Sequence, residues 1–373
     1  MVNQLVIHYL QIISSLLIIF PVFYWVISRW SQKIVLEPDN DFQSNGYETT
    51  ILLPMRNEEG RLNLKIRRVI DEIKTHENVD LLIIDSCSSD STYDSCLEVL
   101  NDSDFPAARW NCRRAILPGK SKAVNLALDS IECEILIVMD TDTQVESGWL
   151  GKIWGSFEEH DIAVISGIEA VQSPSKTVRA YKTNSNYVRM MDSSYHSSPI
   201  LEGGVMAIRL DMMDGFRLDE GTNADDAQIS IEAIRRGHKS KIVQSLRFYD
   251  TNPQKSQFRR SLRRSQGLSR VLSKNLDLVL KANNPFVRVS YINSFLTYVV
   301  VPWATTIMML TCLANLSLGG LTELQNIVGL VFISLSALLP QGKALIWGSL
   351  ISVISHVQLA AGINYSSWDP NTQ

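Results

Sequence analysis

From Leu5 to Ser28 the sequence contains no lysine, arginine, aspartate or glutamate. About 20 apolar residues cross a bilayer as a helix, so this segment is long enough to span one. A cleaved signal peptide carries basic residues before a shorter apolar stretch, whereas Arg29 and Lys33 follow this one. The pattern predicts an uncleaved anchor with the next domain on the cytoplasmic side of the membrane. The alternative is a buried core helix.

The last part of the chain contains three more apolar stretches, at Val289–Ala314, Ile327–Leu339 and Ala344–Ile363. The first and third are long enough to span a bilayer, while the second is short. Lys343 would lie inside the cell, and Asp369 near the carboxyl end would lie outside. This charge bias agrees with four spans in the whole chain, and three spans with one re-entrant segment is the alternative.

A charged domain lies between these ends, in a chain of 373 residues with a net charge of −4 and a pI near 5.9. Roughly 150 residues per domain allows two or three units. Nearly charge-free ends and a charged middle exclude an ordinary soluble protein, a disordered chain and a repeat fibre. The acidic balance argues against nucleic acid as a partner. The five cysteines include no C-x-x-C pair, which predicts free thiols in a reducing compartment.

The order of these segments predicts four parts. They are an N-terminal transmembrane anchor at 1–34, a cytoplasmic domain at 46–255, an amphipathic interfacial helix region at 256–284 and a C-terminal transmembrane region at 286–366. In the third part, one side of a helix gathers Arg259, Arg263, Arg270 and Lys274, with Arg260 and Arg264 beside them. Such a helix fits the membrane surface, with its arginines facing headgroups or an anionic ligand. The alternative is an ordinary helix with a solvated basic face.

Strands and helices alternate in the charged domain. Short apolar runs predict strands at Thr49–Leu53, Asp80–Asp85, Arg113–Leu117, Cys133–Asp140 and Ala163–Ser166. Helical spacing occurs between them at Arg61–Lys74, Thr92–Asn101 and Lys120–Ser130. The alternation predicts a parallel sheet covered by helices, and ligands of such sheets bind beyond the carboxyl ends of the strands.

Polar residues gather where the first two strands end. We expect Pro54 to stop the first strand, so that the following residues expose backbone N–H groups to an anion. These residues are Arg56, Asn57 and Glu58. After the second strand, Asp85 can accept hydrogen bonds from a base or a ribose, or it caps its own turn.

The next two strands end in residues suited to a diphosphate. Gly119 and Lys120 precede a helix, and the lysine can meet a diphosphate as a point charge, although the P-loop spacing is absent. The run ILIVMDTDTQV places Asp140 and Asp142 two residues apart at a strand end. Two such carboxylates hold a hard divalent cation that also binds diphosphate oxygens. An isolated D-x-D more often decorates a surface, but the continuous apolar strand before it favours a metal site.

Six motifs occur in an order and rough spacing that resemble the family 2 glycosyltransferases. They are PMRNEEG, IIDSCSSDST, GKSKAVNLAL, DTD, EGGVMAIR and NADDAQISIEAIRRGHK, and the match covers residues from about 48 to 266. The flanking segments resemble membrane-embedded members such as hyaluronan, chitooligosaccharide and cellulose synthases and ceramide glucosyltransferase. The resemblance implies an α/β GT-A (Rossmann-like) nucleotide-sugar-binding domain with one N-terminal and about three C-terminal transmembrane helices.

The resemblance also implies a role for each matching residue. Asp226 would be the general base and Asp225 the neighbour that positions it, while Asp140 and Asp142 would carry Mg²⁺ or Mn²⁺ on the donor diphosphate. Gly203 and Gly204 would let the backbone approach the sugar or the acceptor. The donor itself would be bound by Pro54, Arg56, Asn57, Glu58, Asp85, Lys120, Arg260 and Arg263. Without the other motifs, an acidic pair such as Asp225 and Asp226 at a helix start is usually a cap.

Two departures from the family pattern bear on the function. An acidic pair is usual where this chain has Asp85 and Ser86, so base recognition can differ. The Q-x-x-R-W motif of processive synthases lacks its tryptophan here, although Arg260 or Arg263 could still reach the diphosphate. The missing aromatic platform weakens the case for a long-chain polymer synthase.

The function implied is inverting, metal-dependent transfer of a sugar from a nucleotide sugar to a lipid or lipid-linked saccharide at the cytoplasmic membrane face. We expect the donor to be a UDP-sugar rather than a GDP-sugar. The protein is expected to be a multi-pass protein of the cell membrane, and a homo-oligomer is possible. The alternatives are a small processive polysaccharide synthase and a non-catalytic nucleotide-sugar-binding membrane subunit.

Overall fold

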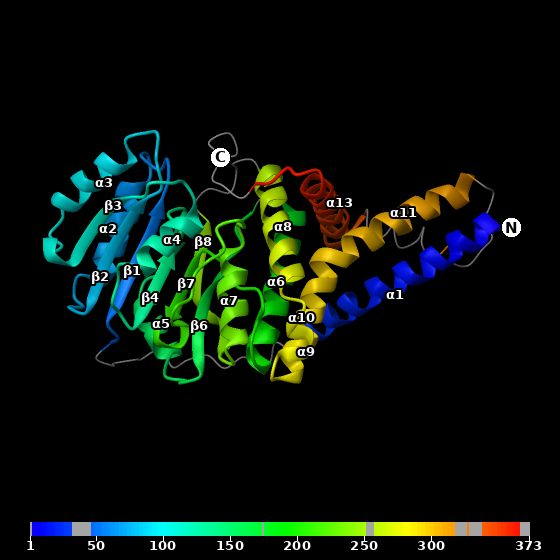
Figure 1. Ribbon diagram of the computed structural model, residues 1–373, viewed down its shortest axis with the longest axis horizontal. Helices are drawn as coiled ribbons and strands as arrows, with labels where there is room; N and C mark the ends of the chain where they lie inside the picture. Colours follow the sequence, from blue (N-terminus) through cyan, green and yellow to red (C-terminus); the bar gives the residue numbers. More distant parts are fainter. Residues whose placement is uncertain are drawn as a thin grey trace.

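The computed structural model describes residues 2–31, 46–173, 175–250, 257–317, 327 and 338–365. Within these residues one eight-stranded sheet has the strand order β3-β2-β1-β4-β7-β6-β8-β5 (Figure 1). The strands are β1 (Thr49–Met55), β2 (Val79–Asp85), β3 (Trp110–Arg114), β4 (Ile135–Met139), β5 (Thr143–Val145), β6 (Ile162–Glu169), β7 (Val205–Arg209) and β8 (Lys239–Asp250).

The sheet is mixed, which corrects the expectation of a parallel sheet. Strands β3, β2, β1 and β4 are parallel, as expected, but β7 runs antiparallel to both β4 and β6, and β5 runs antiparallel to β8. All residues of β7 are buried, like those of β4. A strand buried on both faces reads as a continuous apolar run in either direction, so the sequence pattern does not reveal its orientation.

Two expected strand ends were wrong. The third strand is Trp110–Arg114 rather than Arg113–Leu117, because its residues pair with β2 from Leu81 to Asp85 and leave Ile116 exposed in the following loop. Pro54 does not stop β1, which continues to Met55. Pairing of β1 with β4 ends at Leu52. The missing N–H of Pro54 therefore removes no hydrogen bond from the ladder between β1 and β4.

Helices cover both faces of the sheet. Helices α2 (Leu62–Ile73), α3 (Thr92–Asn101) and α5 (Trp149–Ser156) share one apolar core with the sheet, and α4 (Lys120–Leu128) and α7 (Asp225–Arg235) share the other. The long helix α6 (Lys176–Tyr195) lies at the end of the sheet nearest the apolar helices (Figure 1). Short 3-10 turns at Ala107–Arg109 (η2) and Asp211–Met213 (η3) complete the domain.

The remaining helices join this domain to the apolar segments. They are α1 (Val2–Trp30), α8 (Gln257–Lys274), α9 (Leu278–Lys281), α10 (Pro285–Phe295), the π-helix η4 (Leu296–Val300), α11 (Val301–Ser317) and α13 (Pro340–Ala360). The apolar side of α8, including Val271 and Leu272, packs with α7 and α10. Protein therefore covers this part of the apolar face, while Phe258 is exposed, and the interfacial position of the helix stays a prediction.

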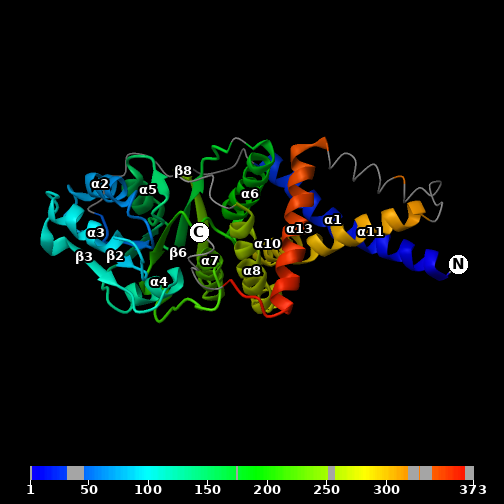
Figure 2. The same cartoon turned by 90° about the horizontal axis from the view of Figure 1, so that it is seen from above.

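Three helices among the described residues are long and apolar enough to cross a membrane: Leu5–Trp30, Pro285–Asn315 and Pro340–Ala360. They agree with a membrane protein. The expected segment Ile327–Leu339 lies almost wholly outside the described residues. Helices α1 and α11 pack along one another and extend away from the sheet (Figure 1). Figure 2 shows α13 lying across this pair, against α8 and α6.

All five cysteines are free, as predicted. Cys96 and Cys312 are buried, and the other three are half-buried. Cys96 and Cys112 approach to 3.4 Å between their sulfur atoms without a disulfide bond.

Candidate active site

A single lysine joins the two acidic motifs that the sequence singled out. The Nζ atom of Lys120 lies 2.8 Å from Oδ1 of Asp140 and 2.7 Å from Oδ2 of Asp225. Burial lowers the pKa of Lys120, but the two carboxylates outweigh burial and raise it above its ordinary value. The ammonium group therefore stays charged and holds the end of β4 against the start of α7.

Ser86 holds the loop that leads into Lys120. It occupies the position at which the family pattern has a second acid. Ser86 is fully buried, and its Oγ accepts a hydrogen bond from the N–H of Gly119 at 2.8 Å. Gly119 has a φ of +145°, a conformation that residues with a Cβ rarely adopt. The departure at Ser86 thus positions the first turn of α4, where Lys120 lies.

Asp225 and Asp226 occupy the first turn of α7, where the helix dipole favours negative charge. The Oδ1 atom of Asp226 accepts a hydrogen bond from the N–H of Ala227 at 2.8 Å. Burial and the neighbouring Asp225 raise the pKa of Asp226 to about 7. One oxygen of Asp226 therefore accepts a backbone hydrogen bond within the first helical turn, and a carboxyl group with this pKa can exchange a proton near neutral pH.

The two adjacent glycines differ in their surroundings. A Cβ at Gly203 would lie 3.7 Å from both Oδ2 of Asp226 and Nζ of Lys120, so this glycine leaves room in front of the acidic cluster. A Cβ at Gly204 would lie 2.4 Å from the ring of Phe248. Close packing against Phe248 is a sufficient reason for glycine at position 204, and an approach to the sugar stays a prediction for both.

Asp85 is buried and already has partners. It accepts hydrogen bonds from the N–H and Oγ of Ser88 and lies 3.6 Å from Nε of Arg114. These contacts give Asp85 the turn-holding role that the sequence left as an alternative. Contact with a nucleotide base stays a prediction.

The loop after β1 is tied to the loop after β2. The N–H of Asn57 donates to Oγ of Ser88 at 3.0 Å, and its Oδ1 accepts from the N–H of Ser89 at 2.9 Å. The N–H of Glu58 donates to Oγ1 of Thr92 at 2.8 Å. Asn57 has a φ of +53°, a strained conformation for a residue other than glycine. Residues 56–58 and 85–92 therefore form one loop cluster beside the acidic motifs, in which the Arg56 side chain is buried.

Lys65 is a site residue that the sequence reading missed. It is buried, and its Nζ donates to the carbonyl oxygen of Thr143 at 2.5 Å, just beyond the D-x-D motif. Burial lowers the pKa of Lys65 to about 7, although Asp140 and Asp142 oppose the change. Its signal was a lysine at a core-facing position of α2, three residues after Leu62.

Two arginines of α8 have different environments. Arg260 lies 3.9 Å from Oδ2 of Asp250. Arg263 faces Asp225 and Asp140, and burial together with Arg264 and Arg260 lowers its pKa. Within the described residues, Nε of Arg263 is buried without a hydrogen-bond partner. A half-buried guanidinium whose Nε has no partner among the described residues is suited to an oxygen of a diphosphate.

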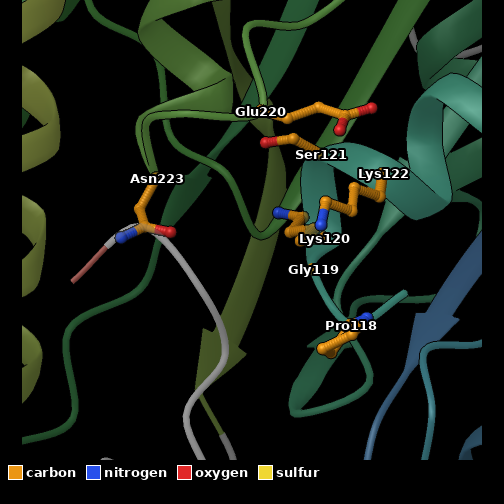
Figure 3. Close-up of a pocket in the computed structure, with 7 residues that line it drawn as sticks. All are labelled: Pro118, Gly119, Lys120, Ser121, Lys122, Glu220 and Asn223. Carbon is orange, nitrogen blue, oxygen red and sulfur yellow. The ribbon is translucent and has the colours of Figure 1, made fainter. Parts of the chain in front are cut away.

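A cavity of about 60 Å³ opens beside Lys120. Figure 3 shows its walls, formed by residues 118–122 at the start of α4 and by Glu220 and Asn223 of the loop before α7. Small-molecule sites usually enclose roughly 300–1,000 Å³, so this cavity is one corner of a site rather than room for a whole nucleotide sugar.

The D-x-D carboxylates fit a divalent cation with an incomplete protein shell. Within the described residues there is no group of three or more histidine, cysteine, aspartate or glutamate side chains placed to hold a metal. Burial raises the pKa of Asp140, which Lys120 opposes. Two carboxylates with the remaining positions left to phosphate oxygens and water are the usual arrangement for Mg²⁺, so the residues present fit the group.

Sequence comparison places these motifs in a family. The model described as Glycosyl transferase family group 2 matches residues 135–363, more than half of the chain, and that described as Glycosyl transferase family 2 matches residues 50–216. The chain belongs to the family 2 glycosyltransferases. A search of curated proteins finds no match. The predicted enzyme class is confirmed.

Solved structures support the fold of this family 2 glycosyltransferase. The mannosyltransferase PcManGT from Pyrobaculum calidifontis, solved with GDP-Man and Mn²⁺, is 18% identical with a TM-score of 0.79, and the match covers 94% of this chain and 98% of that one. TarS 1–349 from S. aureus is 14% identical with a TM-score of 0.46, covering 85% of this chain and 93% of that one. The first likeness shows the fold, and the predicted GT-A domain with apolar helices at both ends is confirmed.

Proposed function

We propose that this enzyme transfers a sugar, with inversion and with Mg²⁺ or Mn²⁺ as cofactor, from a nucleotide sugar to a lipid or lipid-linked saccharide at the cytoplasmic membrane face. One observation carries the proposal: Lys120 joins Asp140 to Asp225, beside Asp226 and Gly203. Carboxylates suited to a metal ion, a candidate base and a glycine without a side chain thus lie together near the ends of the strands. The apolar helices that pack against this domain support a position of the cluster near a membrane.

The residues divide between the two partners of the reaction. The acceptor hydroxyl attacks the anomeric carbon and its proton passes to Asp226, while the bond to the diphosphate breaks and its electron pair leaves with the diphosphate. Asp225, held by Lys120, keeps the first turn of α7 in place. Arg263 would meet the departing charge. A divalent cation on Asp140 and Asp142 would supply further charge neutralisation there.

A donor screen tests the proposal. Purified full-length protein would be incubated with UDP-sugars first and with GDP-mannose beside them, since PcManGT was solved with GDP-Man and Mn²⁺. Release of nucleoside diphosphate, and the length of the product made from labelled donor, would be measured with Mg²⁺, with Mn²⁺ and with a chelator. We expect release from one donor with metal only. A ladder of products indicates the processive synthase instead, and no release from any donor indicates the non-catalytic subunit.

A further inference from the structure

The segment that follows α13 returns to the catalytic domain. Helix α13 ends at Ala360, and residues 363–365, the strap, then lie beside α8 (Figure 1). Gln266 of α8 holds the strap twice. Its Nε2 donates to the carbonyl oxygen of Ile363 at 3.2 Å, and its Oε1 accepts from the N–H of Tyr365 at 3.1 Å. One side chain of α8 thus grips the backbone of a segment far along the chain.

The strap also contacts the loop that carries the candidate base. Asn223 lies two residues before Asp225, and its Nδ2 donates a hydrogen bond to the carbonyl oxygen of Tyr365. The side chain of Asn223 lines the cavity beside Lys120 (Figure 3). The strap therefore holds a residue at the edge of the candidate active site.

Helix α8 supports the same loop directly. A Cβ at Gly267 would lie 3.1 Å from the backbone nitrogen of Ala224, so the helix and the loop are in close contact there. Three residues later, Arg270 donates to the carbonyl oxygen of Gly221 and to Oδ1 of Asn364, each at 2.7 Å. The loop at residues 221–224, helix α8 and the strap thus form one hydrogen-bonded unit.

Hydrogen bonds rather than apolar burial hold the strap. Ile363 keeps 48% of its surface exposed, and Asn364 is also exposed. Gln266 is only 2% exposed, and a buried amide is costly unless its donors and its acceptor are bonded. An apolar residue at position 266 could fill the same space but could not hold the strap.

We propose that Gln266 is a positioning residue: through the strap and Asn223, it holds the loop before α7 so that Asp226 stays aligned for proton transfer. The inference rests on the proposed function, in which Asp226 is the base. A misplacement of about 1 Å, even when it originates far from the chemistry, can cost about 10²-fold in rate. Loss of the strap should therefore be felt in turnover.

The alternative is that Gln266 only joins α8 to α13. Its Nε2 also donates to the carbonyl oxygen of Ser355 in α13 at 3.3 Å. Ser269 provides a matched control, because it is 5% exposed, lies three residues further along α8 and bonds His356 of α13 at 2.6 Å. Ser269→Ala removes a bond between the same two helices and leaves the bonds of Gln266 to the strap in place.

Amide hydrogen exchange of the full-length protein in detergent tests the hold without any substrate. Gln266→Met keeps the length of the side chain but removes its hydrogen bonds. We expect the peptide covering residues 219–224 to exchange about tenfold faster in this variant and at an unchanged rate in Ser269→Ala, while β4 exchanges equally in both. Equal loop exchange in Gln266→Met and the unchanged protein overturns the inference.

A second variant covers the case in which Gln266→Met also speeds exchange of β4 and so loosens the whole domain. Tyr365→Pro leaves α8 intact and removes the N–H that Gln266 accepts. It should speed exchange of residues 219–224 without affecting β4. An unchanged loop in Tyr365→Pro would contradict a role for the strap.

Kinetics with the donor found by the screen separate positioning from binding. Gln266→Met should lower kcat for release of nucleoside diphosphate by about 10- to 100-fold and change the KM for the nucleotide sugar less than about twofold. Ser269→Ala should keep kcat. The double variant Gln266→Met with Asn223→Ala should be no slower than the slower single variant, because both changes break the same link.

Two kinetic results would contradict the inference: a higher donor KM with unchanged kcat in Gln266→Met, or effects that multiply in the double variant. Absence of donor turnover in the unchanged protein would instead contradict the proposed function. In that case the exchange experiment still decides whether Gln266 and the strap hold the loop.

Discussion

At the scale of single residues, the site works through charges that hold one another. Lys120 pairs with both Asp140 and Asp225, while burial and the neighbouring Asp225 raise the pKa of Asp226 to about 7. Lys65 supports the D-x-D loop from beneath through Thr143. The division of labour comes from burial and pairing rather than from residue type, since three of these groups are aspartates.

The pH dependence of transfer should report on Asp226. Burial and Asp225 raise its pKa to about 7, while Lys120 lowers it and Glu202 raises it further. Only the ionised carboxylate can accept a proton, so kcat/KM should rise with pH and level off above about 7. Each unit below that pH should cost about tenfold. The residual activity of Asp226→Asn should not show this rise with pH. An unchanged rise in that variant would mean that another group causes the pH dependence.

Lys65→Met should weaken metal-dependent donor binding by about tenfold, because the Thr143 carbonyl loses its donor and the D-x-D loop its support. The fold should tolerate the change. The pKa of Lys65 is lower in the folded chain than in the unfolded chain. Between about pH 7 and 10 the folded chain therefore binds fewer protons than the unfolded chain, and below that range the charged lysine destabilises the fold. Lys74→Met is the control, because Lys74 is exposed near the end of α2. Donor titrations and thermal unfolding of both variants would check this, and equal donor affinity in both would exclude a supporting role for Lys65.

At the scale of elements, α6 connects the membrane anchor to the site. Near its end, Asp192 accepts a hydrogen bond from the hydroxyl of Tyr24 in α1 at 2.5 Å. One turn earlier, Arg189 pairs with Glu202. Helix α8 packs against α13. The hydroxyl of Ser265 forms a hydrogen bond with that of Ser355 at 2.8 Å, and the hydroxyl of Ser269 forms one with His356 at 2.6 Å. The polar side of α13 thus faces protein, while Leu350 and Val357 are exposed.

If α1 and α11 cross the bilayer together, the crossed orientation of α13 in Figure 2 places it along the membrane surface. Seven residues of a helix rise by about 10 Å. Spin labels at Leu350→Cys and Val357→Cys should therefore lie at similar depth. Labels at Leu16→Cys and Phe23→Cys of α1, which have the same spacing and are also exposed, should differ in depth by about 10 Å. A depth difference in α13 equal to that in α1 would show that α13 spans.

At the scale of the whole molecule, the sequence correctly predicted those elements that depend on the pattern of neighbouring residues. The apolar strand before Asp140, the helix Thr92–Asn101 and the two terminal apolar helices follow from composition and spacing of neighbouring residues. The antiparallel direction of β7 does not, because a fully buried strand has no directional signal. The contacts of Lys65 and Arg264 also escaped prediction. Both depend on segments far apart in the chain, which only the folded sheet brings together.

The central claim is that metal-dependent donor binding and proton transfer are carried by different acids of one cluster. The most direct measurement pairs donor affinity with turnover in Asp142→Ala and Asp226→Asn, each checked for folding by circular dichroism. Asp142→Ala should lose metal-dependent donor binding and, with it, transfer. Asp226→Asn should bind metal and donor nearly as well as the unchanged protein, while turnover falls by about 10²–10⁴-fold. Near-normal turnover in Asp226→Asn, or transfer by the unchanged protein without metal, would contradict the account.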